Sequence, residues 1–254
     1  MSALASERLA RLDPVWSTLR SEAEAIAVSE PALASLVHGA ILAHATLGFE
    51  ERAEWRERQG EPLRSRRQWL LGRMALKEAV RWWIHARTGV LPYPADIFVG
   101  HDEFGAPFVD GWWSDSLIAA PRVSLSHDSE SNIAAVSDDE YPVGVDAERV
   151  GRIRRPESMA GALTASERDW LQQQPDPSAA VLRLWCAKEA AAKWCGRGLE
   201  GAPEAFEVTF ESGGAECLAT VHAADMMIPV RILHVGNSIL AIAEYEPGMT
   251  KVEE

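Results

Sequence analysis

Two short stretches of this 254-residue chain carry the side chains that a site for a metal ion and a phosphate needs. Residues 143–148 begin with Val-Gly-Val, which favours a β-strand, and side chains on a strand alternate between its two faces. Asp146 and Glu148 therefore project from the same face and could hold one cation between them. Residues 182–195 are rich in Ala and Leu, contain no Pro, and indicate a helix that carries Glu189.

The chemistry of these three acids points to magnesium rather than zinc. Carboxylates are hard oxygen ligands, and they suit a hard cation that keeps part of its water shell. Lys188 lies beside Glu189, and Lys193 follows one helical turn later, so positive charge for a phosphate is close by. The spacing alone leaves a second interpretation open, a solvated strand end and a salt-bridged helix face, because the Asp-x-Glu pattern is common.

A second group of charges lies on a helix predicted over residues 66–83. Arg66, Arg73 and Lys77 are spaced 7 and 4 residues apart, which keeps them on one side of that helix. A row of cations on a helix whose other side is buried suits a phosphorylated ligand. A solvated charged stripe is the alternative interpretation.

Ser126 and His127 end a strand predicted over residues 123–127. Val and Leu occupy one face of this strand, which leaves the serine hydroxyls on the other. A hydroxyl and an imidazole at a strand terminus can donate hydrogen bonds to a diphosphate. A capped turn would use the same residues.

The chain contains an internal repeat. The segment KEAVRWW at residues 77–83 corresponds in type to KEAAAKWC at residues 188–195, and Pro94 and Pro203 follow the two segments at similar distances. A short strand follows each proline, and then a glycine turn. Two copies of one helix–hairpin unit predict two similar halves, and a cleft between halves is a natural ligand site.

These motifs occur in the order found in Sfp-type 4′-phosphopantetheinyl transferases, and the chain resembles that family from residue 49 to about residue 245. The sequence of residues 69–81 is especially similar to that of transferase domains linked to polyketide and polyunsaturated fatty acid synthases. The motifs that carry the resemblance are Leu70-Leu71-Gly72-Arg73, Gly105-x-Pro107, Ser126-His127, Gly144-Val145-Asp146-x-Glu148 and Trp185-x-x-Lys188-Glu189-x3-Lys193. This sequence has Ala106 where the family often has Lys or Arg, so one contact to the 3′-phosphate is absent or moved to Arg73.

The resemblance implies an α+β fold of two pseudo-symmetric halves, at residues 48–138 and 139–254, after a helical extension at residues 1–47. It implies coenzyme A in the cleft between the halves and Mg²⁺ at the pyrophosphate. The implied reaction transfers 4′-phosphopantetheine from coenzyme A to a serine of an apo acyl or peptidyl carrier protein and releases 3′,5′-ADP.

The resemblance also implies a role for each motif residue. Asp146, Glu148 and Glu189 are the implied magnesium ligands. Glu189, or a metal-bound water that it orders, accepts the serine proton, and Asp146 and Lys193 complete the catalytic group. The implied contacts to coenzyme A are Lys188 and Lys193 at the phosphates, Ser126 and His127 at the diphosphate, and Arg66, Arg67 or Arg73 at the 3′-phosphate.

Residues 1–47 are predicted to be helical, with a helix start at Asp13-Pro14 and a restart at Ser29-Glu30-Pro31. This stretch resembles the N-terminal helical region of serine acetyltransferases. The hexapeptide repeat that carries acetyl transfer in those enzymes is absent. We therefore expect a packing or self-association element here and a monomeric catalytic core.

Composition excludes several classes of protein. A formal charge of −13 argues against general nucleic-acid binding, and no apolar run approaches the roughly 20 residues that span a bilayer. Three cysteines without metal-ligand spacing, and an N-terminus without a secretory pattern, predict a cytoplasmic protein. A run of arginines contrasts with this acidic balance and is predicted to meet the carrier protein, unless it is only a solvated loop: Arg149, Arg152, Arg154 and Arg155.

An enzyme is the leading interpretation, and a non-catalytic module that binds coenzyme A or a carrier protein is the alternative. The complete set of acids and lysines argues against the alternative, because a degenerate copy would be expected to lose at least one of them. The acidic balance disfavours a nuclease or another metal-dependent phosphotransferase.

Overall fold

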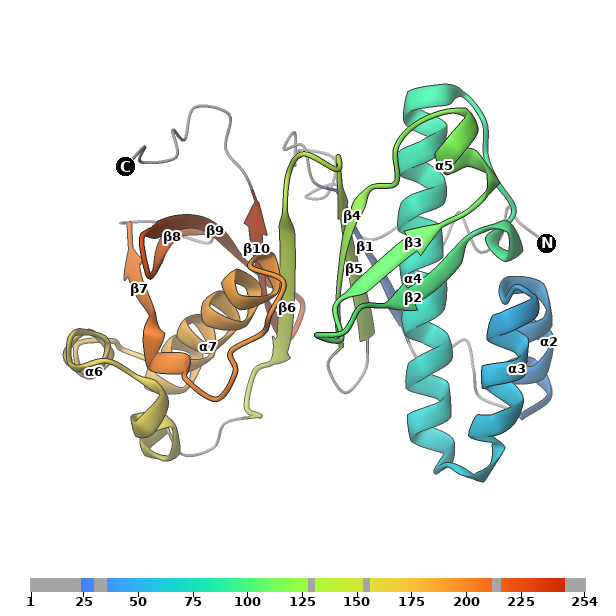
Figure 1. Cartoon of the computed structure of the whole chain (residues 1–254). Coiled ribbons are helices and arrows are strands. Elements are labelled where there is room, and N and C mark those ends of the chain that lie inside the picture. Colours follow the sequence, from blue (N-terminus) through green and yellow to red (C-terminus); the bar gives the residue numbers. More distant parts are fainter. Residues whose placement is uncertain (1–23, 30–35, 128–130, 153–155, 212–215, 245–254) are drawn as a thin grey trace. The chain divides into compact units, whose positions relative to one another are not determined.

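A computed structural model describes residues 24–29, 36–127, 131–152, 156–211 and 216–244. The chain divides into two compact units, Met1–Tyr141 and Pro142–Glu254. Each unit combines helices with antiparallel sheet, which confirms the predicted α+β class (Figure 1). Within the described part of the chain, no helix combines the length and the apolar character needed to cross a bilayer.

The first unit contains a three-stranded sheet in the order β1-β5-β4 and a separate hairpin of β2 and β3. Both sheets are antiparallel. The elements are β1 (Glu24–Ser29), α2 (Leu36–Thr46), α3 (Phe49–Glu57), η3 (Arg58–Gly60), α4 (Leu63–Thr88), η4 (Pro94–Asp96), β2 (Phe98–His101), β3 (Pro107–Asp110), α5 (Trp112–Ser116), β4 (Arg122–His127) and β5 (Ser131–Ser137).

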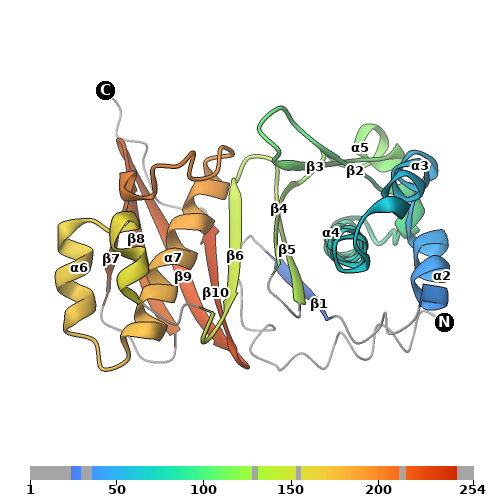
Figure 2. The ribbon, with the colours of Figure 1, turned by 90° about the horizontal axis from the view of Figure 1, so that it is seen from below.

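Helix α4 is the centre of the first unit. It lies between the three-stranded sheet on one side and helices α2 and α3 on the other (Figures 1 and 2). Leu70, Leu76, Val80 and Ile84 on this helix are fully buried in one apolar core. The predicted helix over residues 66–83 is confirmed, and it is longer at both ends, from Leu63 to Thr88.

The second unit is one five-stranded antiparallel sheet in the order β6-β10-β9-β8-β7. Helix α7 packs along this sheet, and α6 lies beside α7 and β7 (Figure 2). The elements are β6 (Val143–Arg149), η5 (Pro156–Ala162), α6 (Ala165–Gln172), α7 (Pro177–Trp194), η6 (Pro203–Ala205), β7 (Phe206–Phe210), β8 (Glu216–Ala223), β9 (Met226–Val235) and β10 (Ser238–Glu244).

The two units repeat one plan, as the sequence predicts. In each, a first strand precedes the long helix and pairs antiparallel with the last strand of the unit, β1 with β5 and β6 with β10. A short 3₁₀ turn and a hairpin follow the long helix in both. The repeat therefore starts at β1, so residues 24–29 are part of the first half rather than of an extension before it.

The N-terminal segment departs in part from the helical prediction. Helix α2 confirms the second predicted helix, whereas residues 24–29 form a strand and not the end of a first helix. Ile26 and Val28 are β-branched and lie opposite Ala134 and Asn132 of β5, so pairing with a neighbouring strand outweighs a helix-like apolar spacing. The predicted helix start at Asp13 and the restart at Pro31 lie outside the described residues.

Candidate functional site

Strand β6 presents two of the three predicted acids. It is an edge strand of its sheet, where Asp146 lies opposite Ala241 and Glu148 opposite Ile239 of β10. Both acids are nearly buried, at 6% and 5% exposure. Buried carboxylates are costly unless cations or hydrogen-bond donors compensate them, so the surroundings of these two side chains decide their state.

Gly144 sets the distance between β6 and α7. A Cβ atom at this position would lie 1.9 Å from the carbonyl oxygen of Ala190 and 2.6 Å from the backbone nitrogen of Trp194. Any side chain here would therefore push the strand away from the helix. The glycine brings the carboxylate of Asp146 within reach of side chains on α7.

Lys193 on α7 joins the helix to the strand. Its ammonium donates hydrogen bonds to the carbonyl oxygen of Val145 at 2.9 Å and to Oδ1 of Asp146 at 2.8 Å. The side chain is 25% exposed, so one end of this ion pair is open to solvent. Since an ammonium has three donors, one N–H of Lys193 is not used by these contacts.

Glu189 lies one turn before Lys193 on α7 and is half-buried. Burial raises the pKa of its carboxyl above the ordinary value, and the negative charge of Asp146 raises it further. The positive charges of Lys193 and Arg152 act in the opposite direction. The two acids therefore repel each other, and the local charge favours a proton or another cation.

Glu148 is paired with an arginine from its own chain segment. Arg152 contacts the Glu148 carboxylate as an ion pair, and its side chain is 63% exposed while that of Glu148 is 7% exposed. The predicted carrier contact of Arg152 thus competes with this internal pairing. Arg154 and Arg155 of the same arginine run lie outside the described residues.

The three acids are not arranged as a complete set of metal ligands. Among the residues that the structure describes, no group of three His, Cys, Asp or Glu side chains is placed to hold a metal ion. Asp146 and Glu148 are instead each neutralised by a basic side chain. A divalent cation would share these two carboxylates with Arg152 and Lys193 or compete with them.

Lys188 has a different environment from the one that the sequence predicts. Its side chain is fully buried and donates to Oε1 of Glu167 at 2.8 Å and to the carbonyl oxygens of Pro203 at 2.9 Å and Phe206 at 2.6 Å. These contacts use all three donors of the ammonium. We therefore revise the predicted phosphate contact of Lys188 to a structural role.

Glu167, which the sequence reading missed, completes this buried group. Its Oε2 accepts a hydrogen bond from the backbone of Thr164 at 2.8 Å as part of a capping box at the start of α6. Its Oε1 also accepts from the backbone of Val208 at 2.7 Å. The capping-box pattern Thr-x-x-Glu at residues 164–167 is the sequence signal that could have identified it.

The first unit contains the same kind of buried lysine–glutamate pair at the equivalent lysine. Lys77 is fully buried, forms an ion pair with Glu51, and donates to the carbonyl oxygen of Thr46 at 2.9 Å. Glu51 in turn accepts from the backbone of Gly48 at 2.9 Å at the start of α3. The two lysines of the sequence repeat are therefore structural anchors, and neither is available to a phosphate.

Arg73 is also engaged inside the first unit. It is 4% exposed, donates to the carbonyl oxygen of Val99, and lies 3.3 Å from Oε2 of Glu54. Its guanidinium lies 4.9 Å from the ring centroid of Trp69. Burial lowers its pKa below the ordinary value. Its internal contacts replace the predicted contact with a 3′-phosphate.

Arg66 and Arg67 are half-buried on the first turns of α4. The Arg66 guanidinium lies 4.6 Å from the ring centroid of Trp55, which stacks on Trp69 at 6.0 Å. Nε of Arg66 is buried and has no hydrogen-bond partner among the described residues. Of the three predicted arginines, Arg66 and Arg67 are half-buried and Arg73 is buried with internal partners.

Ser126 and His127 lie at the end of β4, as predicted. Ser126 is 3% exposed and His127 is exposed at the last position of the strand. They lie opposite Ile133 and Asn132 of β5. Their predicted contact with a diphosphate stays a prediction.

Two family models match the chain. Residues 142–243 match the 4′-phosphopantetheinyl transferase superfamily, and residues 15–50 match the N-terminal region of serine acetyltransferase. Both predicted resemblances are thereby confirmed over these residues. The first match includes β6 and α7, the elements that carry the three acids and Lys193.

The chain is also similar to two solved holo-[acyl-carrier-protein] synthase structures, each 22% identical over 41% of this chain. The one from Thermotoga maritima has a TM-score of 0.34, and the chain spans 62% of its length. The one from Bacillus anthracis str. Ames, in complex with CoA (3′,5′-ADP), has a TM-score of 0.35 and is covered over 93%. No curated protein matches this sequence.

Proposed function

We propose that this chain transfers 4′-phosphopantetheine from coenzyme A to a serine hydroxyl of an apo carrier protein and releases 3′,5′-ADP. The observation that carries the proposal is that, in the second unit, the family match and the contact between β6 and α7 involve the same residues. The segment that matches the transferase superfamily is the segment in which Gly144 brings Asp146 of β6 against Lys193 of α7, with Glu189 beside them.

The donor set fits a magnesium ion. Asp146, Glu148 and Glu189 supply only carboxylate oxygens, and burial together with the charge of Asp146 raises the pKa of Glu189, so a cation beside these acids would be stabilising. Magnesium bound by these acids would supply positive charge at the diphosphate of coenzyme A.

Lys193 and Glu189 can act directly on the reactants. The unused N–H of Lys193 can donate to a phosphate oxygen while its other donors hold Val145 and Asp146. The raised pKa of Glu189 makes it a better proton acceptor than an ordinary carboxylate. The serine oxygen then bonds to the phosphorus that carries pantetheine, the bond to the leaving 3′,5′-ADP breaks, and the serine proton passes to Glu189.

Three residues of the first unit are proposed to bind coenzyme A. The half-buried Arg66 and Arg67 are proposed for the 3′-phosphate, and the exposed His127 could donate to the diphosphate. Arg73 and Lys188 leave this set because internal contacts engage them.

The intact mass of an apo carrier protein tests the proposal. After incubation with this chain, coenzyme A and Mg²⁺, the carrier should gain the mass of one phosphopantetheine, and EDTA should prevent the gain. The variant Glu189→Ala should lose transfer by about 100-fold or more while coenzyme A still binds. Asp169→Asn, at an exposed acid of α6, is the matched control and should transfer normally. Coenzyme A binding without any mass gain in the unaltered chain would identify a non-catalytic binding module instead.

A further inference from the structure

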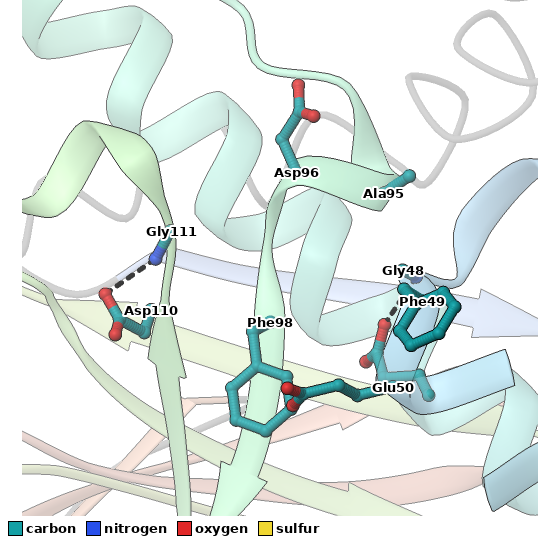
Figure 3. Close-up of a pocket in the computed structure, with 9 residues that line it drawn as sticks. Gly48, Phe49, Glu50, Ala95, Asp96, Phe98, Asp110 and Gly111 are labelled. Atoms are coloured by element: carbon teal, nitrogen blue, oxygen red, sulfur yellow. Dashed lines mark hydrogen bonds between the residues drawn. The ribbon is translucent and has the colours of Figure 1, made fainter. Parts of the chain in front are cut away.

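A pocket of about 490 Å³ lies within the first unit, whereas the acids of the proposed reaction lie on β6 and α7 of the second. Figure 3 shows its walls, which come from the start of α3, from η4 and β2, and from the end of β3. Gly111 allows the end of β3 to lie close to η4, because a Cβ at this position would lie 2.5 Å from the carbonyl oxygen of Asp96. The proposed transfer reaction does not use this pocket.

The charge in the pocket is negative throughout. Glu50, Asp96 and Asp110 are exposed lining residues, and among the described residues no Lys, Arg or His lines the pocket. Asp96 accepts from the backbone of Tyr93 at 3.2 Å and Asp110 from that of Gly111 at 2.7 Å, so both carboxylates are fixed in position. Asp110 also accepts from the hydroxyl of Ser114 at 2.6 Å.

A buried acceptor in the same pocket also has no donor. The side chain of Glu51 is 1% exposed and lines the pocket. Its Oε2 is engaged by Lys77 and by the backbone of Gly48, but Oε1 is buried and has no hydrogen-bond partner in the described part of the chain. A buried acceptor without a donor costs about 1–3 kcal/mol. A ligand with an N–H donor would remove that cost.

Aromatic side chains surround these acids. Phe49 and Phe98 line the pocket and are 85% and 36% exposed. Three more exposed rings lie near the lining residues: Tyr93 at 76%, whose backbone donates to Asp96, Phe108 at 44%, whose ring contacts that of Phe98, and Trp112 at 52%, which follows Gly111 in the chain. Aromatic faces attract cations, and a group of exposed rings is typical of a protein-binding surface.

We propose that this pocket binds the side-chain cation of an arginine or lysine that a partner polypeptide presents. Its guanidinium or ammonium group would be attracted by the acidic lining and would donate to a carboxylate there, and the aromatic faces would contact its charge. The exposed rings near the pocket favour a polypeptide over a free polyamine, because apolar side chains of a polypeptide could cover them.

NMR titration of the full ¹⁵N-labelled chain tests this proposal. The probe is the peptide acetyl-Ala-Leu-Arg-Leu-Ala-amide, and the reporters are the backbone amides of Gly48, Phe98 and Gly111. We expect these amides to shift and the affinity to fall as salt is added. A peptide with neutral citrulline in place of arginine should bind about tenfold more weakly, since the ion pairs and the cation–π contact are lost.

Variants locate the site. The double variant Glu50→Gln with Asp96→Asn should weaken binding of the arginine peptide by about threefold to tenfold. Glu57→Gln, at the exposed last residue of α3 and outside the pocket, should bind as the unaltered chain does. If the double variant does not fold, by its circular dichroism spectrum, the citrulline comparison on the unaltered chain decides.

Several results would overturn the proposal. These are equal binding of the arginine and citrulline peptides, shifts confined to amides outside the pocket, and equal weakening by Glu57→Gln and by the pocket variant. Spermidine that shifts the same amides at equal affinity would overturn the assignment to a polypeptide. Each of these outcomes is independent of whether a carrier protein gains phosphopantetheine.

Discussion

At the residue scale, two lysines of one helix have opposite environments. Lys188 is fully buried with all three donors bound inside the second unit, while Lys193 is partly exposed and contacts the carboxylate of Asp146. Five residues separate them, a spacing that places them on different faces of α7. Lys188 therefore stabilises the fold, and Lys193 belongs to the proposed reaction.

The two lysines should respond differently to removal of their charge. Lys188→Met leaves Glu167 as an uncompensated buried charge and should lower the free energy of unfolding by about 3–5 kcal/mol. Lys193→Met leaves the nearly buried Asp146 without its cation, but water can reach the partly exposed position of the ammonium and replace part of the interaction, so the cost should be smaller, about 1–2 kcal/mol. Urea unfolding followed by circular dichroism measures both. Similar costs would show that burial does not distinguish the two sites.

The acids offer a second test at this scale. Because the positive charge of Lys193 opposes the rise in the Glu189 pKa, Lys193→Met should raise that pKa further in metal-free protein. Protonated Glu189 would then persist to higher pH. A ¹³C NMR titration of the glutamate carboxyls in EDTA measures the change. Arg183→Met, on the same helix and beside His234, should leave the Glu189 titration unchanged, and a shift of similar size there would contradict the assignment.

At the scale of elements, the contact between β6 and α7 determines the candidate site. Strand β6 places its acids two residues apart, and α7 places Glu189 and Lys193 one turn apart. Neither pattern by itself brings the two sets together. The absence of a side chain at Gly144 does so, since the backbone of α7 fills the space that a Cβ would need.

Gly144→Ala should therefore disturb stability and the site together. Overpacking of this kind costs about 1–3 kcal/mol, and a shift of β6 should also break the contact between Lys193 and Asp146. Thermal unfolding and the transfer assay should both report a loss. Gly161→Ala is a suitable control, because nothing lies within 4 Å of its Cβ position. An unaltered melting temperature in Gly144→Ala would show that the strand can move without cost.

The same scale explains the correction at the N-terminus. Residues 24–29 have an apolar spacing that fits a helix, yet they pair with β5 in the position that β6 takes beside β10. A strand is stable there because its neighbour supplies the hydrogen bonds that an isolated segment lacks. The repeat in the sequence begins at the long helices and so does not include these first strands.

At the scale of the whole molecule, charge determines how a carrier protein is approached. The chain carries a formal charge of −13, and carriers of the proposed class are generally acidic, so the two proteins should repel each other at long range. Productive docking then depends on local basic side chains. Arg149 and Arg152 are the described members of the arginine run, and Arg152 is paired with Glu148.

Salt should therefore increase the transfer efficiency. Raising ionic strength from low values to about 0.15 M screens the repulsion, so kcat/KM for an acidic carrier should rise while coenzyme A affinity falls or stays constant. Initial rates over a series of NaCl concentrations measure this. A kcat/KM that falls with salt would show that a local basic surface, and not the net charge, directs the encounter.

The sequence by itself determined the features that depend on local periodicity. The alternation of β6, the helices around residues 66–83 and 182–195, the internal repeat and the resemblance over residues 142–243 all follow from spacing and residue type. These features indicate which residues share a strand or helix. They also led to Asp146, Glu148, Glu189 and Lys193 as a group, and the metal role of the acids stays a prediction.

Only the tertiary structure decided which charged side chains are available. Lys77, Lys188 and Arg73 have the residue types and spacing of phosphate ligands, but each is engaged by an acid or a carbonyl from another element. Glu51 and Glu167, which engage the two lysines, lie 26 and 21 residues before them in the chain. A spacing pattern shows which face a side chain takes on its own element. Whether that face meets solvent or a buried carboxylate depends on the packing of distant segments.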